Sequence, residues 1–264
     1  MSDFLADVVR EVRASVEAPG YLRDLPPPPR YAPPRLSAAI RAARERGALL
    51  VEHKRVSPGS ADPRLPPRPI PEFVRLAERG GAAGFSCLAT APRFDGSPGD
   101  VAELARATGR PVLFKDFVVD PRQIEAAERA HASAILLIAR LAQPPYGIAL
   151  GPLARDARAR GLEVLLEFHA RSELSLADDV PADMYGVNVR DLATLAIDRA
   201  TATETLRAAA DRRPLLGLSG VDGPEAAGRF WALGVDGILV GTGFARAPDP
   251  VAFLRSLARP GDRR

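Results

Sequence analysis

The stretch Pro111-Val112-Leu113-Phe114-Lys115-Asp116-Phe117 has the pattern of a strand buried on both faces of a parallel sheet. It is short and apolar, and charged residues come only toward its end. Seven other runs of the same kind occur along the chain, at residues 48–54, 83–89, 134–140, 163–169, 184–190, 214–219 and 237–241. The sequence therefore predicts eight buried strands.

Helical patterns separate these runs, at residues 70–79, 121–130, 150–160 and 224–233 among others. Strands that alternate with helices indicate a parallel sheet, and eight such units favour an α/β fold closed into an eight-stranded (β/α)8 TIM barrel. The length of 264 residues fits, because such barrels take about 250 residues. An open doubly wound sheet is the alternative, but the count of eight and the absence of a glycine-rich first turn favour the barrel.

The first part of the chain has a different pattern. Residues 2–17 have helical periodicity with Ser2 as the expected cap, a tetraproline run follows at 26–29, and a second helix is expected over 36–46. We expect the two helices to pack over or beside the mouth of the barrel. The predicted organisation is a helical extension with a proline-rich strap (1–46), a barrel (47–259) and a polar tail (260–264).

The composition excludes some classes of partner. The net charge is only +3 and the basic residues form no run, which disfavours nucleic acid. We find no apolar stretch long enough to cross a membrane and no basic signal region. The single cysteine rules out an internal disulfide and fits a reducing cytoplasm. We expect a cytoplasmic monomer.

Of the 36 basic residues, two are lysines, Lys54 and Lys115, and each follows an apolar run. Arginine keeps its proton at any workable pH, whereas burial and neighbouring charges can tune lysine into a proton donor or acceptor. Two lysines on a solvated surface are the alternative. Their equivalent positions at strand ends favour a catalytic pair, because barrel enzymes carry their chemistry at the C-terminal ends of the strands.

Other polar residues end the predicted strands. Glu52 lies two residues before Lys54 and therefore on the same side of its strand. Glu167 ends the fifth strand, and Asn188 and Arg190 end the sixth. A packed barrel would not hold so many charges unless a ligand is arranged among them.

Small residues end the last two strands, namely Ser219, Gly220, Gly241 and Thr242. Backbone N–H groups there can approach an anion, and this is the usual phosphate site of such barrels. Ser57 could reach the same anion from the other side. A plain turn is the alternative, because glycine also ends strands for steric reasons. The position of Gly241 and Thr242 at the end of the eighth strand favours a phosphate site.

His169 follows Glu167 by two residues. It could bind a metal, but no second histidine is near in sequence, so we expect it to pack or to support another side chain. We predict no metal site.

Five segments together resemble the indole-3-glycerol phosphate synthase family. Glu52-His53-Lys54-Arg55-Val56-Ser57-Pro58 resembles its Glu-x-Lys-Arg-x-Ser-Pro segment, and Phe94-Asp95-Gly96-Ser97 resembles its Phe-x-Gly-Ser loop. Residues 115–124, 161–169 and 186–192 follow in the family's order. The resemblance extends from the N-terminal helices to Pro250.

The resemblance implies a lyase without a cofactor. The family closes and decarboxylates a small phosphorylated aromatic amine, 1-(2-carboxyphenylamino)-1-deoxyribulose 5-phosphate, to indole glycerol phosphate, carbon dioxide and water. It implies that Lys115 is the general acid of ring closure and that Glu167 and Lys54 serve the later dehydration, with their division of labour open. Glu52 would hold Lys54 charged and oriented.

The resemblance also implies how the substrate is held. Arg190 would pair with the anthranilate carboxylate, and Asn188 would fix the hydroxyls. Phe94 and Phe117 would form a wall for the aromatic ring and exclude water.

One departure from the family is substantial. Its seventh strand typically ends Glu-Ser-Gly, whereas this chain has Leu218-Ser219-Gly220. Leu218 cannot ionise, so the charge balance beside the first lysine changes. Three functions therefore stay open: the synthase reaction, a divergent paralogue for a related arylamino-ribulose phosphate in a secondary pathway, and a barrel that only binds a phosphorylated ligand.

Overall fold

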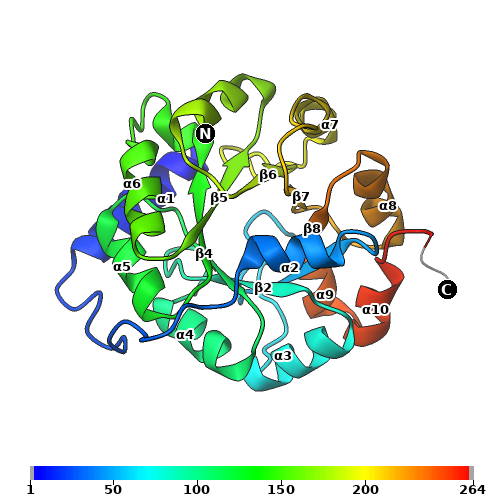
Figure 1. Ribbon diagram of the computed structural model, residues 1–264, viewed down its shortest axis with the longest axis horizontal. Helices are drawn as coiled ribbons and strands as arrows, with labels where there is room; N and C mark the ends of the chain where they lie inside the picture. The colour runs from blue at the N-terminus through cyan, green and yellow to red at the C-terminus, as the bar shows by residue number, and fades with distance from the viewer. Residues whose placement is uncertain (1–2, 262–264) are drawn as a thin grey trace.

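Eight parallel strands form a closed barrel in the computed structural model, which describes residues 3–261 (Figure 1). Each strand pairs with the next in sequence, and β8 pairs with β1. Every strand lies within one of the eight predicted runs, so the predicted (β/α)8 TIM barrel is confirmed. The strands are β1 (Ala48–His53), β2 (Gly84–Leu88), β3 (Val112–Lys115), β4 (Ala134–Ile138), β5 (Glu163–Phe168), β6 (Met184–Asn188), β7 (Leu215–Leu218) and β8 (Gly237–Val240).

Helices surround the barrel and cover the outward faces of the strands (Figure 1). The longer ones are α3 (Ile70–Arg79), α4 (Pro98–Ala107), α5 (Pro121–Arg129), α6 (Leu150–Ala159), α7 (Arg199–Ala208), α8 (Pro224–Ala232) and α10 (Pro250–Ser256). Shorter elements are α9 (Thr242–Arg246) and the 3₁₀ segments η1 (Ala139–Ala142) and η2 (Arg171–Asp179). Within residues 3–261, no helix has the length and apolar character that a membrane span requires.

Local sequence explains where these helices begin. At α5 the Asp120 side chain accepts a hydrogen bond from Arg122 N (2.9 Å), and the Gln123 side chain accepts one from Asp120 N (3.1 Å). Pro121, which has no N–H to satisfy, occupies the first turn. This cap fixes the loop that leaves β3 immediately after Lys115.

The two N-terminal helices lie at opposite ends of the barrel (Figure 1). Helix α2 (Leu36–Ala43) closes the N-terminal end, where Ser37 Oγ donates to Glu163 Oε1 (2.5 Å) at the start of β5. Helix α1 (Phe4–Glu17) lies at the C-terminal end, where Phe4 N donates to Ala193 O (3.2 Å) beyond β6. The expectation that both helices lie at the mouth is therefore right for α1 and wrong for α2.

The proline-rich strap explains this separation. The segment that contains the tetraproline run connects α1 to α2 along the outside of the barrel (Figure 1). Arg129 at the end of α5 holds it by donating to Pro26 O (3.0 Å) and Leu22 O (3.3 Å). The predicted boundaries at residues 47 and 260 stay predictions, and residues 262–264 of the predicted tail lie outside the described part of the chain.

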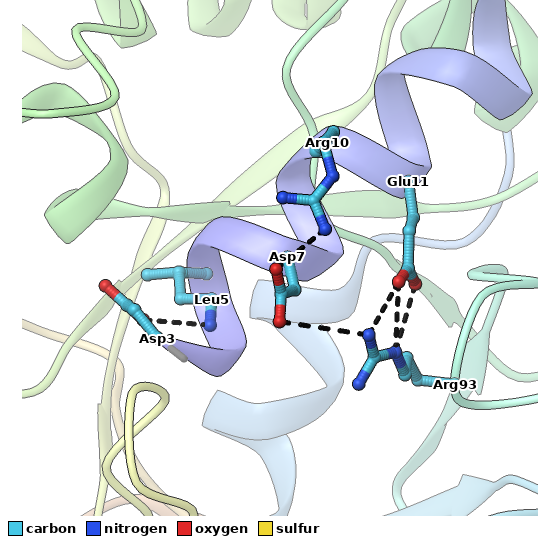
Figure 2. Close-up of polar contacts among 6 residues, drawn as sticks. All are labelled: Asp3, Leu5, Asp7, Arg10, Glu11 and Arg93. Carbon is cyan, nitrogen blue, oxygen red and sulfur yellow. Dashed lines mark hydrogen bonds and ion pairs between the residues drawn. The ribbon is translucent and has the colours of Figure 1, made fainter. Parts of the chain in front are cut away.

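Helix α1 is attached to the loop after β2 (Figure 2). Glu11 Oε1 accepts from Arg93 Nη2 at 2.6 Å, and Arg93 also lies 4.0 Å from an Asp7 oxygen. Asp3, rather than the predicted Ser2, accepts from Leu5 N (3.0 Å) and caps the helix, while Ser2 lies outside the described residues. These contacts bring the N-terminal segment to the end of the barrel where the charged strand ends gather.

Candidate active site

Glu52 lies between the two lysines at the C-terminal mouth of the barrel. Its Oε1 is 2.8 Å from Lys54 Nζ, and its Oε2 is 3.8 Å from Lys115 Nζ. Burial alone would raise the pKa of the Glu52 carboxyl, but the two ammoniums outweigh burial and hold that pKa below its ordinary value. The Glu52 carboxylate of β1 therefore orients both lysines. Lys54 follows β1 directly, and Lys115 is the last residue of β3.

Both lysines keep access to a ligand. The side chains of Lys54 and Lys115 are 16% and 20% exposed, whereas that of Glu52 is 4% exposed. Glu52 Oε2 has no hydrogen-bond partner among the described residues. Glu52 thus holds both ammoniums from inside the barrel, and their exposed sides face the mouth. A group that gives or takes a proton needs such access to the substrate.

Glu167 forms the other side of the charged cluster. Its Oε1 accepts from Asn188 Nδ2 (3.1 Å) on the neighbouring strand and lies 3.3 Å from His169 Nε2. Burial opposes ionisation of Glu167, but His169, Lys115 and Asn188 together hold its pKa below the ordinary value. Asn188 Oδ1 in turn accepts from Arg190 N (3.0 Å), so the amide is oriented from both ends.

A cavity of about 560 Å³ opens beside this cluster, over the ends of β7 and β8. Four of the five predicted phosphate residues line it, namely Ser219, Gly220, Gly241 and Thr242. The fifth, Ser57, has its Oγ 3.0 Å from Thr242 Oγ1. The structure thus brings together the residues that the sequence predicted for one anion.

Two of the small residues have geometric reasons to be small. A Cβ at Gly241 would lie 2.8 Å from Glu52 Oε1 and 3.0 Å from Lys54 Nζ, so glycine leaves room for the ion pair. Gly220 has a φ of +69°, and a Cβ there would lie 2.7 Å from Val189 Cγ2. Ser219 also has a positive φ of 66°, which is uncommon for a residue with a side chain and occurs often at functional sites.

Arg190 lines the same cavity, as Lys54 does. Its Nη1 donates to Leu195 O (2.7 Å), and among the ion pairs of the described residues none involves Arg190. Burial lowers the pKa of its guanidinium, with Glu52 partly opposing the effect. A half-buried guanidinium with unused donors is suited to an anionic group of a ligand.

Three aromatic rings form a row at the C-terminal end of the barrel. The rings of Phe94 and Phe117 have centroids 5.8 Å apart, and Phe4 of α1 extends the row with its centroid 6.4 Å from that of Phe94. Phe94 and Phe117 are the two predicted ring contacts. Phe4 was missed, because it is distant in sequence and its helix reads as an ordinary amphipathic segment.

Sequence reasoning also missed two arginines of the cavity, Arg199 at the start of α7 and Arg246 at the end of α9. Arg246 also donates to Asp62 O in the loop that follows β1. In a chain where nearly every basic residue is arginine, no local signal distinguishes these two from surface arginines.

Leu218 occupies the position where the resemblance predicted a carboxylate. Leu218 is 1% exposed. It packs against Gly186, where an added Cβ would lie only 2.7 Å from Leu218 Cδ1. In the sheet register Leu218 pairs with Asn188. An apolar side chain therefore fills the barrel interior next to a candidate substrate-binding amide.

Sequence comparison finds one family over nearly the whole chain. A sequence model of indole-3-glycerol phosphate synthase matches residues 3–257. The chain is similar to indole-3-glycerol phosphate synthase 2 of Streptomyces coelicolor (40% identity, covering 86% of each chain). It is also similar to the indole-3-glycerol phosphate synthase of Methanopyrus kandleri (37% identity, 81% of this chain and 84% of the relative).

Solved structures share the fold at low sequence identity. One is a thiamine phosphate pyrophosphorylase from Pyrococcus furiosus, with a TM-score of 0.56, 18% identity and coverage of 82% of this chain and 95% of that one. Another is 3-hexulose-6-phosphate synthase from Salmonella typhimurium, with a TM-score of 0.58, 13% identity and coverage of 80% and 96%. At this identity the likeness concerns the barrel alone.

Proposed function

Because the chain belongs to the indole-3-glycerol phosphate synthase family, a family of carboxy-lyases of tryptophan biosynthesis, we propose that it closes and decarboxylates 1-(2-carboxyphenylamino)-1-deoxyribulose 5-phosphate. The observation that carries this proposal is the position of Glu52 between Lys54 and Lys115 at the barrel mouth. Ring closure followed by loss of water needs two separate proton-handling groups, and this arrangement supplies them.

The substrate has three features that match side chains at the C-terminal end of the barrel. Its phosphate would bind at Gly220, Gly241 and Thr242, where backbone N–H groups and a hydroxyl are available. Its carboxylate would pair with Arg190, and its aromatic ring would lie against Phe94 and Phe117. The ribulose chain would then cross the mouth between the two lysines.

Lys115 acts in the first step. The ring carbon that carries the carboxylate attacks the ribulose carbonyl carbon, and the carbonyl π electrons move to its oxygen. Lys115 Nζ donates a proton to that oxygen, which becomes a hydroxyl. The carbon–carboxylate bond then breaks, carbon dioxide leaves, and its electron pair restores the aromatic ring. Glu52 Oε2, 3.8 Å from Lys115 Nζ, holds this donor in place at the mouth.

Glu167 and Lys54 act in the dehydration. The new hydroxyl leaves as water with one added proton, and the methylene carbon next to the ring nitrogen loses a proton as the indole double bond forms. Glu167 is ionised and can accept a proton, while Lys54 carries an ammonium that can supply one. Asn188 fixes Glu167 and offers its remaining donor to a substrate hydroxyl.

The direct test is an assay of the purified protein with the carboxyphenylamino-deoxyribulose phosphate. Indole fluorescence should appear together with one equivalent of carbon dioxide. Absence of both, with a folded protein, would contradict the proposal.

A second substrate is favoured by Leu218. An apolar side chain beside Asn188 provides no charge for a polar substrate group. A related arylamino-ribulose phosphate with an apolar substituent would suit it. Comparing kcat/KM for ring-substituted substrates with that for the unsubstituted one distinguishes the two reactions.

A further inference from the structure

Three buried ionisable side chains lie in a row behind the mouth, Glu167, His169 and Glu173. His169 Nε2 is 3.3 Å from Glu167 Oε1, and its Nδ1 is 3.8 Å from Glu173 Oε2. The His169 side chain is 6% exposed, and those of both glutamates are 1% exposed. Only the first of the three reaches the cluster of strand ends described above.

The row is held in place from both sides. Glu173, in η2, accepts from the backbone N of His169 with its Oε2 (2.7 Å), which ties η2 to the end of β5. The neutral Asn188 amide from β6 donates to Glu167 Oε1, the oxygen that also faces His169, and the Lys115 ammonium from β3 acts on the same carboxylate. The imidazole is therefore faced by a carboxylate from its own strand and by another from η2.

Charge balance favours a cation at this place. Two carboxylates out of contact with water are costly unless a positive charge neutralises them. The Lys115 charge helps to stabilise the Glu167 carboxylate, but no lysine or arginine of the described residues forms an ion pair with Glu173. The imidazole is the group placed between the two.

We propose that His169 is a positioning residue that carries a positive charge in the resting protein and holds the Glu167 carboxylate ionised and aimed at the mouth. This inference rests on the proposed function only for its effect on turnover. The charge on His169 is independent of the reaction and is tested separately.

The ionisation equilibria agree with this geometry. Burial alone would lower the pKa of His169, but Glu167 and Glu173 raise it to about 9. His53 is a contrasting case within the same chain, because burial beside Arg55 lowers its pKa. At pH 7.5 the two histidines should therefore be in opposite states, His169 protonated and His53 neutral.

The first test is ¹⁵N NMR of the imidazole rings in the full-length protein at pH 7.5. The chain has only three histidines, so His169→Gln and His53→Gln assign the signals. We expect two protonated ring nitrogens at His169 and a neutral ring at His53. A neutral His169 overturns the proposal, whatever the activity of the protein.

The second test is the pH dependence of kcat. His169→Gln keeps a donor near Glu167 but carries no charge, so kcat should fall about tenfold while KM changes by less than about twofold. Glu173→Gln keeps an acceptor for His169 N and removes one of the two carboxylates. It should move the alkaline fall of kcat to lower pH by about one unit.

The outcomes separate the two ideas. An alkaline limb that stays unchanged in Glu173→Gln, in a variant that folds and turns over, shows a structural role and overturns the positioning role. A wild-type protein with protonated His169 and no indole glycerol phosphate formation contradicts the proposed function and supports the charge on His169.

Discussion

Glu52 Oε1 lies 2.8 Å from Lys54 Nζ, at the point where β1 ends and the mouth begins. The same carboxylate faces Lys115 with its other oxygen, so its removal frees two ammoniums that then repel each other. We expect Glu52→Gln to lower kcat by about 100-fold, because both proton-handling groups lose their position. Steady-state kinetics checks this. The exposed Glu225→Gln on α8 is the matched control and should leave kcat unchanged.

Lys115→Arg should lower turnover by at least about 100-fold, as for other lost general acids. Arginine keeps the charge beside Glu52 but does not release its proton. Substrate affinity, measured by fluorescence titration, should change far less than kcat. Turnover like that of the wild type would assign the acid role to another group.

Gly241→Asp should abolish binding of inorganic phosphate, because it places a negative charge against the anion. The smaller change Gly241→Ala should already weaken binding, since a Cβ there lies 2.8 Å from Glu52 Oε1 and displaces the ion pair. Calorimetric titration with phosphate measures both. Gly109→Ala is the control, because a Cβ at Gly109 meets no atom within 4 Å. Full affinity in Gly241→Asp would show that the phosphate site lies elsewhere.

Leu218→Glu should raise the synthase rate about tenfold, or ~1.4 kcal/mol of barrier, if the substrate is the unsubstituted one. The change places a carboxylate next to Asn188 on the neighbouring strand, in the charged cluster. Leu218→Gln has the same size without the charge and should give no such increase. A fall in rate with Leu218→Glu on an apolar-substituted substrate would favour the second reaction.

Stability should decrease between pH 6.5 and 9 through His169. Below pH 6.5, the ordinary pKa of histidine, His169 is protonated in both the folded and the unfolded chain. Between pH 6.5 and about 9 the folded chain keeps this proton, whereas the unfolded chain loses it. The unfolding free energy therefore falls as pH rises, by on the order of 3 kcal/mol over the window. Urea unfolding at pH 6 and pH 9.5 measures the difference. In His169→Gln this part of the pH dependence should be absent.

The barrel and the place of its chemistry could be predicted because both follow from local rules. A short run such as 134–138, apolar on both faces, is typical of a strand in a covered parallel sheet. Parallel strands all end on the same side, so Glu52, Lys115 and Glu167 had to meet at one mouth. Their convergence required no knowledge of distances.

Other features depend on contacts between distant segments. The hydrogen bond between Ser37 and Glu163 holds α2 at the far end, and only the packing of α1 brings Phe4 to the row of aromatic rings. The charge expected on His169 follows from Glu173, which η2 brings against the end of β5.

The amino-acid sequence by itself thus determined the eight strands and the residues at their C-terminal ends, because periodicity and strand direction are properties of the local chain. The tertiary structure decided which of these residues touch and in which charge state they are held. The physical reason is that hydrogen bonds and ion pairs act over a few ångströms, and burial multiplies their effect. Sequence spacing cannot specify such distances between separate strands.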